Sequence, residues 1–194
     1  MTATFRFLCV FCTFALGTAL GTEIAGVKLD DKIQIAPNTP ELVLNGAGVR
    51  TRIIVKVYVA GLYLPEKKGA ATEVLALSGA KRMSLAMLRD LTAQQFAEAL
   101  TEGFNANNAP PDQERYKAQL ADLIGIMTSL GQVKKGDMIA LEYIPELGLR
   151  VRVNGAEQGK PIADEGFYRA LLKVWLGDKP VDSDLKRALL GQGS

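Results

Sequence analysis

The stretch from Leu44 to Leu64 constrains the fold most, because it sets a glycine turn before two runs rich in β-branched residues. Such residues favour extended strands. The odd positions from Ile53 to Val59 are all apolar, and most even positions of the stretch are polar, which predicts a strand with one apolar and one polar face. The polar face carries Arg50, Arg52, Lys56 and Tyr58. We therefore expect a strand covered on one side.

Further strands and two helices are expected on either side of this stretch. Short strands are predicted at Ile24–Val27, Lys32–Ala36 and Glu41–Leu44, then a short helix at 70–77 and a strand at 81–89. Thr92 and Gln95 form a capping-box pattern that starts a helix with Phe96, Leu100 and Phe104 at helical spacing. A second amphipathic helix is predicted over 113–130, after two prolines.

The carboxyl-terminal half predicts a hairpin and two closing helices. Residues 137–144 and 148–154 alternate with period two, and a tight turn leads into a strand at 156–160. Asp164 caps the next helix, and either Asp182 or Ser183 caps the last one. Strands, helices, strands and helices in this order predict an α+β fold without regular βαβ alternation.

The amino-terminal residues have the layout of a secretory signal peptide. A single arginine precedes a short apolar run and then small residues, so we expect a signal peptide over 1–21, one domain over 22–194, and export across the inner membrane to the periplasm. A retained membrane anchor is the alternative, although the apolar run is short for a hydrocarbon layer of about 30 Å. No other membrane contact is expected, and a monomer is expected.

The composition excludes several chemistries. The chain has no histidine, and both cysteines, Cys9 and Cys12, lie in the predicted signal peptide. This excludes His-based catalytic triads and His/Cys zinc sites from the exported domain. No nucleotide-binding or calcium-binding motif is present, so no cofactor and no metal is expected. A net charge of +2 without a basic block gives no footprint for nucleic acid.

Three segments resemble the chalcone isomerase superfamily. They are the GAGVR-to-AGLYL hairpin, the LTAQQFAEALTEGF helix and the LLKVWLGDKPVDSDLKRALL tail. The resemblance implies an open-faced β-sandwich, in which a large antiparallel sheet carries a helical layer and a ligand cleft lies between them.

In catalytic plant members of that superfamily, an arginine after the GAG turn and four further polar side chains hold the substrate. The resemblance places Arg50 at the arginine. It places Tyr58, Phe96, Ala99 and Gly103 at the positions of the four further polar side chains. It places Val174 at the position of a substrate-contacting hydroxyl residue of the closing helix. Because Phe96, Ala99, Gly103 and Val174 cannot donate hydrogen bonds from their side chains, the resemblance argues against catalysis.

An arginine and a tyrosine in an apolar cleft suit an anionic amphiphile instead. Arginine pairs with a carboxylate through two hydrogen bonds, and fatty-acid-binding relatives are similar at these two positions. The predicted ligand-binding residues are Arg50, Tyr58, Phe96 and Trp175, with Val57 and Leu100 as further wall candidates, and no catalytic residue is assigned. The alternatives are an isomerase or intramolecular lyase acting on a phenolic enone, and a structural or partner-binding protein whose cleft has collapsed.

One geometric condition decides whether Arg50 and Tyr58 can share a ligand. Along an unbroken strand they would lie about 26 Å apart, so the chain has to reverse between them. Residues 51–54 include none of the usual turn formers. If the chain does not reverse there, Tyr63 and Arg89 are the substitutes.

Overall fold

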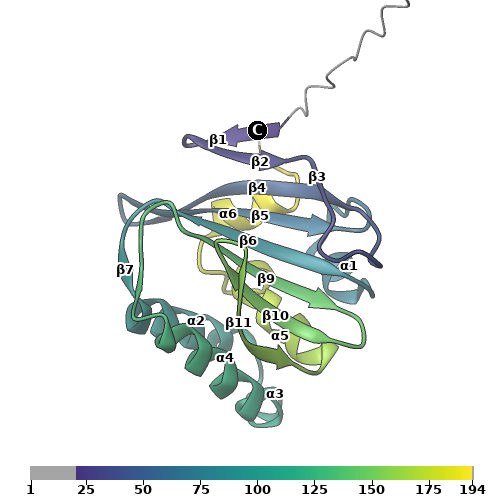
Figure 1. Ribbon diagram of the computed structural model, residues 1–194, viewed down its shortest axis with the longest axis vertical. Coiled ribbons are helices and arrows are strands. Elements are labelled where there is room, and N and C mark those ends of the chain that lie inside the picture. The colour runs from purple at the N-terminus through teal and green to yellow at the C-terminus, as the bar shows by residue number, and fades with distance from the viewer. Residues whose placement is uncertain (1–20, 194) are drawn as a thin grey trace, which may run out of the picture.

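The computed structural model describes residues 21–193. All but the last residue of the predicted signal peptide lie outside this range. The fold centres on a seven-stranded sheet in the order β11-β10-β9-β6-β5-β4-β3, and every pair of neighbouring strands is antiparallel. Its strands are β3 Lys32–Ile33, β4 Leu42–Arg52, β5 Val55–Leu64, β6 Lys81–Met87, β9 Met138–Ile144, β10 Gly148–Val153 and β11 Ala156–Ile162. The predicted α+β fold with a large antiparallel sheet is confirmed (Figure 1).

Six helices accompany the sheet within the described residues. They are α1 Ala71–Ala76, α2 Ala93–Asn107, α3 Pro110–Arg115, α4 Lys117–Ser129, α5 Glu165–Leu176 and α6 Ser183–Leu189. The predicted caps are present, because the side chains of Thr92 and Asp164 accept backbone N–H bonds from the first turns of α2 and α5, and Asp182 does the same for α6. None of the helices within residues 21–193 is long and apolar enough to cross a bilayer.

Two short two-stranded sheets complete the fold. β1 Gly21–Ile24 pairs with β2 Val27–Asp30, and β7 Leu91–Thr92 pairs with β8 Gln132–Val133. The first pair corrects the prediction of one strand over 24–27, because Ala25 and Gly26 have φ of 50° and 79° and form a turn. A left-handed conformation at consecutive residues is typical of a tight hairpin turn.

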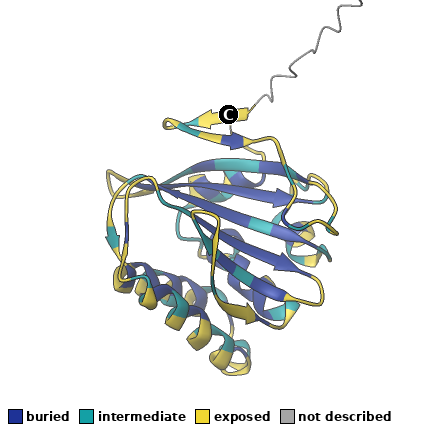
Figure 2. Ribbon diagram, in the orientation of Figure 1, coloured by how far each residue is buried: buried dark blue, intermediate teal, exposed yellow. Residues whose placement is uncertain are grey.

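The main core lies between the sheet and the helices. The strand residues on this face pack against α2, α4 and α5, and the central strands β5, β6 and β9 are buried along most of their length (Figure 2). The second face is also covered, since Leu29 and Ile35 from the amino-terminal segment pack against Val59 and Tyr63. Burial of apolar side chains on both faces stabilises the sheet without disulfides.

Two further predictions are corrected by this packing. β5 is buried on both faces from Val57 to Leu64, whereas burial on one face was predicted. Tyr58 lies in the main core, although the other residues of its predicted face are polar. The predicted single helix over 113–130 is divided at Tyr116, whose φ of −103° and ψ of 13° leave helical values. The Tyr116 ring packs against Phe167 with the centroids 6.0 Å apart, which favours the break.

Candidate functional site

The hairpin of β4 and β5 brings Arg50 and Tyr58 together. The chain reverses at Ile53 and Ile54, and the antiparallel register then pairs Arg50 directly with Tyr58. Ile53 has a φ of 61°, a left-handed value that a turn usually assigns to glycine. The geometric condition for a shared ligand is therefore met without any of the usual turn residues.

Arg50, Tyr58 and Trp175 form a connected polar group within apolar surroundings. The guanidinium carbon of Arg50 lies 5.5 Å from the centroid of the Tyr58 ring. The Trp175 indole N–H donates a 2.9 Å hydrogen bond to the Tyr58 hydroxyl oxygen. Arg50 Nε is buried and makes no hydrogen bond to any described residue. A charged donor in this state has unused binding capacity.

The Tyr58 hydroxyl remains protonated at neutral pH. Burial raises the pKa of the Tyr58 hydroxyl above its ordinary value, and the positive charge of Arg50 offsets this only in part. Because the hydroxyl oxygen already accepts from Trp175, its own proton is the group available to a ligand. The hydroxyl can therefore donate a hydrogen bond to an anion held by Arg50.

The apolar side chains around this group leave almost no space. All four predicted ligand-binding residues, Arg50, Tyr58, Phe96 and Trp175, line one cavity, together with Ala99, Leu100, Val174 and Val181. Its volume is about 10 Å³, which is close to the minimum that admits one water molecule. The inner cavity is thus closed in this structure.

Close packing of α2 against α5 accounts for the closure. Gly103 of α2 faces α5, and a Cβ added there would lie 2.9 Å from Val174 Cγ1 and 3.3 Å from Val181 Cγ1. The absence of a side chain at Gly103 lets the two helices approach. Phe96 and Leu100, from the same helix as Gly103, line the small cavity together with Arg50.

A larger groove of about 480 Å³ begins at the outer side of the closed cavity. Arg50, Phe96 and Ala99 line both spaces, so Arg50 lies between the closed cavity and the groove. Apolar contributions come from Val55, Val57 and Leu91, and charged ones from Arg52, Arg89, Glu98 and Glu102. This groove runs between the end of the sheet and α2.

The comparisons with known proteins agree with this architecture. The model of a family described as chalcone isomerase-like matches residues 21–191. The chain belongs to the chalcone isomerase-like family. A search of curated protein sequences finds no match.

Among solved structures, this chalcone isomerase-like chain is similar to the Arabidopsis thaliana fatty-acid binding protein AtFAP1. The TM-score is 0.62 at 16% sequence identity, and the match covers 85% of this chain and 92% of that one. At this identity the likeness establishes the fold.

The positions that the superfamily resemblance assigns to catalysis can now be located. Phe96, Ala99 and Val174 line the inner cavity, and Gly103 lies against Val174. None of these four side chains carries a hydrogen-bond donor. The polar donors at the chalcone isomerase-like cavity among the described residues are therefore Arg50, Tyr58 and Trp175.

The two substitute residues occupy different places. Arg89 lines the outer groove with Arg50, whereas Tyr63 lies on the second face of the sheet, away from both spaces. Burial raises the pKa of Tyr63 to about 12. Val57 lines the groove and Leu100 lines the inner cavity.

Sequence reasoning missed several residues around Arg50. Gln95, Glu98 and Glu102 face the groove from α2, and their three- and four-residue spacing could have placed them on one helix face with Ala99. Asp182 accepts a 2.9 Å hydrogen bond from the backbone N–H of Thr51 while it caps α6. No sequence signal links residues so far apart in the chain.

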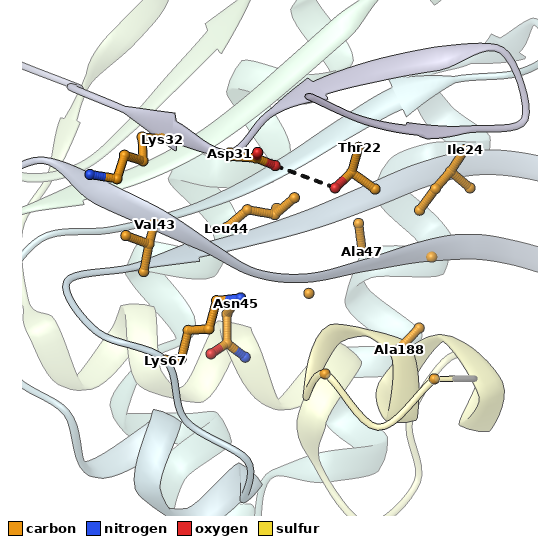
Figure 3. A pocket seen from close by; sticks show the side chains of 14 residues that line it. Thr22, Ile24, Asp31, Lys32, Val43, Leu44, Asn45, Ala47, Lys67 and Ala188 are labelled. Carbon is orange, nitrogen blue, oxygen red and sulfur yellow. Dashed lines mark hydrogen bonds between the residues drawn. The ribbon is translucent and has the colours of Figure 1, made fainter. Parts of the chain in front are cut away.

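A cavity of larger volume in the chalcone isomerase-like domain lies elsewhere. It has a volume of about 660 Å³ and runs along β4 between the β1–β2 pair and the carboxyl-terminal turn, and Thr22, Asn45 and Gly193 contribute to its wall (Figure 3). Asn45 is its most buried polar side chain, and it already bonds to the backbone of Lys68 and Leu189. Within residues 21–193 no group of three or more acidic or cysteine side chains is placed to hold a metal.

Proposed function

We propose that this chalcone isomerase-like protein binds a fatty acid or another small apolar carboxylate and does not catalyse its conversion. The carboxylate pairs with Arg50 and accepts a hydrogen bond from the Tyr58 hydroxyl. The observation that carries this proposal is the buried Nε of Arg50, which has no acceptor among the described residues and belongs to a residue that lines both the closed cavity and the groove. An anionic oxygen there supplies the missing acceptor.

The apolar part of the ligand lies in the outer groove. Val55, Val57, Leu91 and Phe96 offer apolar surface along it, and its volume of about 480 Å³ falls within the range of small-molecule sites, roughly 300–1,000 Å³. Each methylene buried there contributes about 0.8 kcal/mol. The structurally similar AtFAP1 is a fatty-acid binding protein, which supports the same ligand class.

We expect no catalysis because side-chain hydrogen-bond donors are missing at the positions that hold the substrate in catalytic members. An isomerase of a phenolic enone has to stabilise negative charge with several preorganised donors, and each one lost typically costs about 10²–10³ in rate. Phe96, Ala99, Gly103 and Val174 supply none. We expect purified protein to convert chalcone to flavanone no faster than buffer does, and a turnover lost in Arg50→Ala would contradict this part of the proposal.

The binding test compares two arginines of the same groove. Native mass spectrometry and calorimetric titration with palmitate are applied to the wild type, Arg50→Ala and the control Arg52→Ala. Because a hydrogen bond to a charged group contributes about 1.5–3 kcal/mol, Arg50→Ala is expected to weaken palmitate binding by about 10- to 150-fold. Arg52→Ala, at an exposed position, is expected to change it little.

A second comparison isolates the carboxylate. Hexadecanol has the same chain without the charge, so it is expected to bind wild type and Arg50→Ala equally and more weakly than palmitate binds the wild type. Equal palmitate affinity in wild type and Arg50→Ala would remove the anchor role of Arg50.

The inner cavity of about 10 Å³ favours a second candidate function, that of a structural or partner-binding protein. In that case Phe96 and Trp175 serve packing alone. The two candidates differ in the titration, since a purely structural protein shows no saturable binding of palmitate or hexadecanol.

We propose in addition that the protein is exported and acts in the periplasm as a monomer. The support is the sequence of residues 1–21, with one arginine, an apolar run and small residues. Amino-terminal sequencing of protein from fractionated cells tests this, and an uncut chain in the cytoplasmic fraction would overturn it.

A further inference from the structure

The turn between β4 and β5 exposes a run of apolar side chains at one end of the sheet. Ile53 and Ile54 are 93% and 87% exposed, and Val55 follows at 40%. The turn extends past the end of the sheet, beside the chain that enters β7 (Figure 1). Single exposed apolar residues are common, but three in succession are unfavourable for a soluble surface unless they have a function.

The backbone of this turn is also strained. Ile53 adopts a φ of 61°, which β-branched side chains disfavour and glycine or asparagine accept. A folding requirement alone would be met better by glycine at this position. An isoleucine at this strained position therefore points to a role for its side chain outside the folded domain.

Basic residues from three segments surround the exposed run. The β6–β7 and β8–β9 connections lie at the same end of the sheet, because Leu88 N–H bonds to the Val57 carbonyl and Met87 N–H to the Asp137 carbonyl. The exposed cations of these segments and of the hairpin are Arg52, Lys56, Arg89, Lys134 and Lys135.

These cations are free to meet an external anion. None of the five has an ion-pair partner within residues 21–193. The acids of the two connections are engaged, since Asp90 accepts from Lys135 N–H and Asp137 from Lys134 N–H. Glu98 and Glu102 face the groove from α2.

We propose that this end of the sheet docks on the surface of an anionic lipid bilayer. Ile53 and Ile54 insert among the acyl chains near the headgroups, and the surrounding cations pair with lipid phosphates. A second copy of this chain fits the surface less well, because its five cations would face five identical ones. Membrane contact then extends beyond the amino-terminal segment expected from the sequence.

The position of the groove connects this surface with ligand exchange. Ile53 and Val55 line the groove that contains Arg50, so a docked tip places its opening against the lipid. Docking itself does not rest on the proposed function, because a bilayer can be bound whether or not a fatty acid enters the groove.

A local probe tests docking independently of the amino-terminal segment. Ile54→Trp and the control Leu147→Trp, at an apolar residue 52% exposed on the β9–β10 turn, are prepared in the same chain. Both keep the buried Trp175 as a common background. Emission is recorded with vesicles of phosphatidylcholine alone and mixed with phosphatidylglycerol, with and without brominated acyl chains.

Docking predicts a blue shift and bromine quenching for Ile54→Trp on the anionic vesicles, weakened by salt, and neither change for Leu147→Trp. The paired variant Ile53→Gly/Ile54→Ser, which relieves the positive φ, is expected to fold and to lose vesicle binding relative to the wild type. Equal quenching of the two tryptophans, or a dimer abolished by the paired variant without any vesicle effect, would overturn the proposal.

Discussion

The Trp175 indole N–H donates to the Tyr58 hydroxyl at 2.9 Å, and this bond joins α5 to β5 across 117 residues of chain. Both side chains are buried. The bond fixes the orientation of the hydroxyl beside Arg50, so the same contact stabilises the fold and shapes the candidate site.

Tyr58→Phe is therefore expected to destabilise the protein. It leaves the buried Trp175 N–H without an acceptor, which costs about 1–3 kcal/mol. Denaturant unfolding followed by far-ultraviolet circular dichroism measures the change, because this signal does not depend on Trp175, the single tryptophan, which the double variant removes. Tyr116→Phe serves as control, because the Tyr116 hydroxyl bonds to no described residue among the hydrogen bonds of the structure. Additive losses in Tyr58→Phe/Trp175→Phe would show that the bond contributes nothing.

Gly103→Ala is expected to lower stability by about 1–3 kcal/mol, because the new methyl group would lie 2.9 Å from Val174 Cγ1. Gly125→Ala is the matched control. Gly125 is in α4 with nothing within 4 Å of an added Cβ, so alanine there is expected to stabilise by about 0.5–1 kcal/mol. Thermal unfolding of both variants and of Gly103→Ala/Val174→Ala, which makes room for the methyl, measures the difference. Equal effects at the two glycines would contradict the packing argument.

Glu142→Ala is expected to cost about 3–5 kcal/mol, because it leaves buried arginine charge uncompensated. Glu142 is fully buried, with Arg150 at 2.8 Å and Arg82 at 3.5 Å. Arg150 also bonds to the Ile35 carbonyl, which connects the amino-terminal segment to the second face of the sheet.

Chemical denaturation measures the free energy of unfolding of Glu142→Ala and of the control Glu41→Ala. The control removes an exposed ion pair with Lys32 and is expected to cost less than about 1 kcal/mol. Similar costs for both would refute a special role for the buried cluster.

Stability is expected to fall in alkaline solution. Burial raises the pKa of Tyr58, Tyr63, Tyr143 and Tyr168 above 10.0, and that of Tyr63 to about 12. As the pH rises past 10.0, the unfolded chain loses these protons before the folded one does, so unfolding becomes more favourable until the folded pKa is passed.

The free energy of unfolding measured from about pH 9 to about pH 12 checks this dependence. Tyr63→Phe should reduce the slope between pH 10.0 and about 12, because it removes one of the four contributions. A wild-type slope that Tyr63→Phe leaves unchanged would contradict the assignment.

The helix caps and most strands could be predicted from the sequence, because their signals are local. Thr92, Asp164 and Asp182 each act within a few residues of their own position. The β4–β5 turn could not be predicted in the same way, since its isoleucines have no turn propensity and the register is set by pairing along the whole hairpin.

The grouping of the candidate residues could be predicted from the sequence, but the state of the cavity could not. Arg50, Tyr58, Phe96 and Trp175 line one cavity, and their role in ligand binding stays a prediction. The closure of the inner cavity depends on how near α2 lies to α5. Gly103 influences that distance, but it belongs to no sequence motif from which the close approach could be predicted. The burial of Tyr58 in the main core likewise results from the helices that cover β5, which alternation along one strand does not reveal.

Thr22 and Gly193 both line the cavity shown in Figure 3, so both ends of the described chain lie at a single groove. A short linker can then close the domain into a ring, and new ends can be opened at the exposed β9–β10 turn. Fusion partners attached at Thr22 and Gly193 would be held as neighbours.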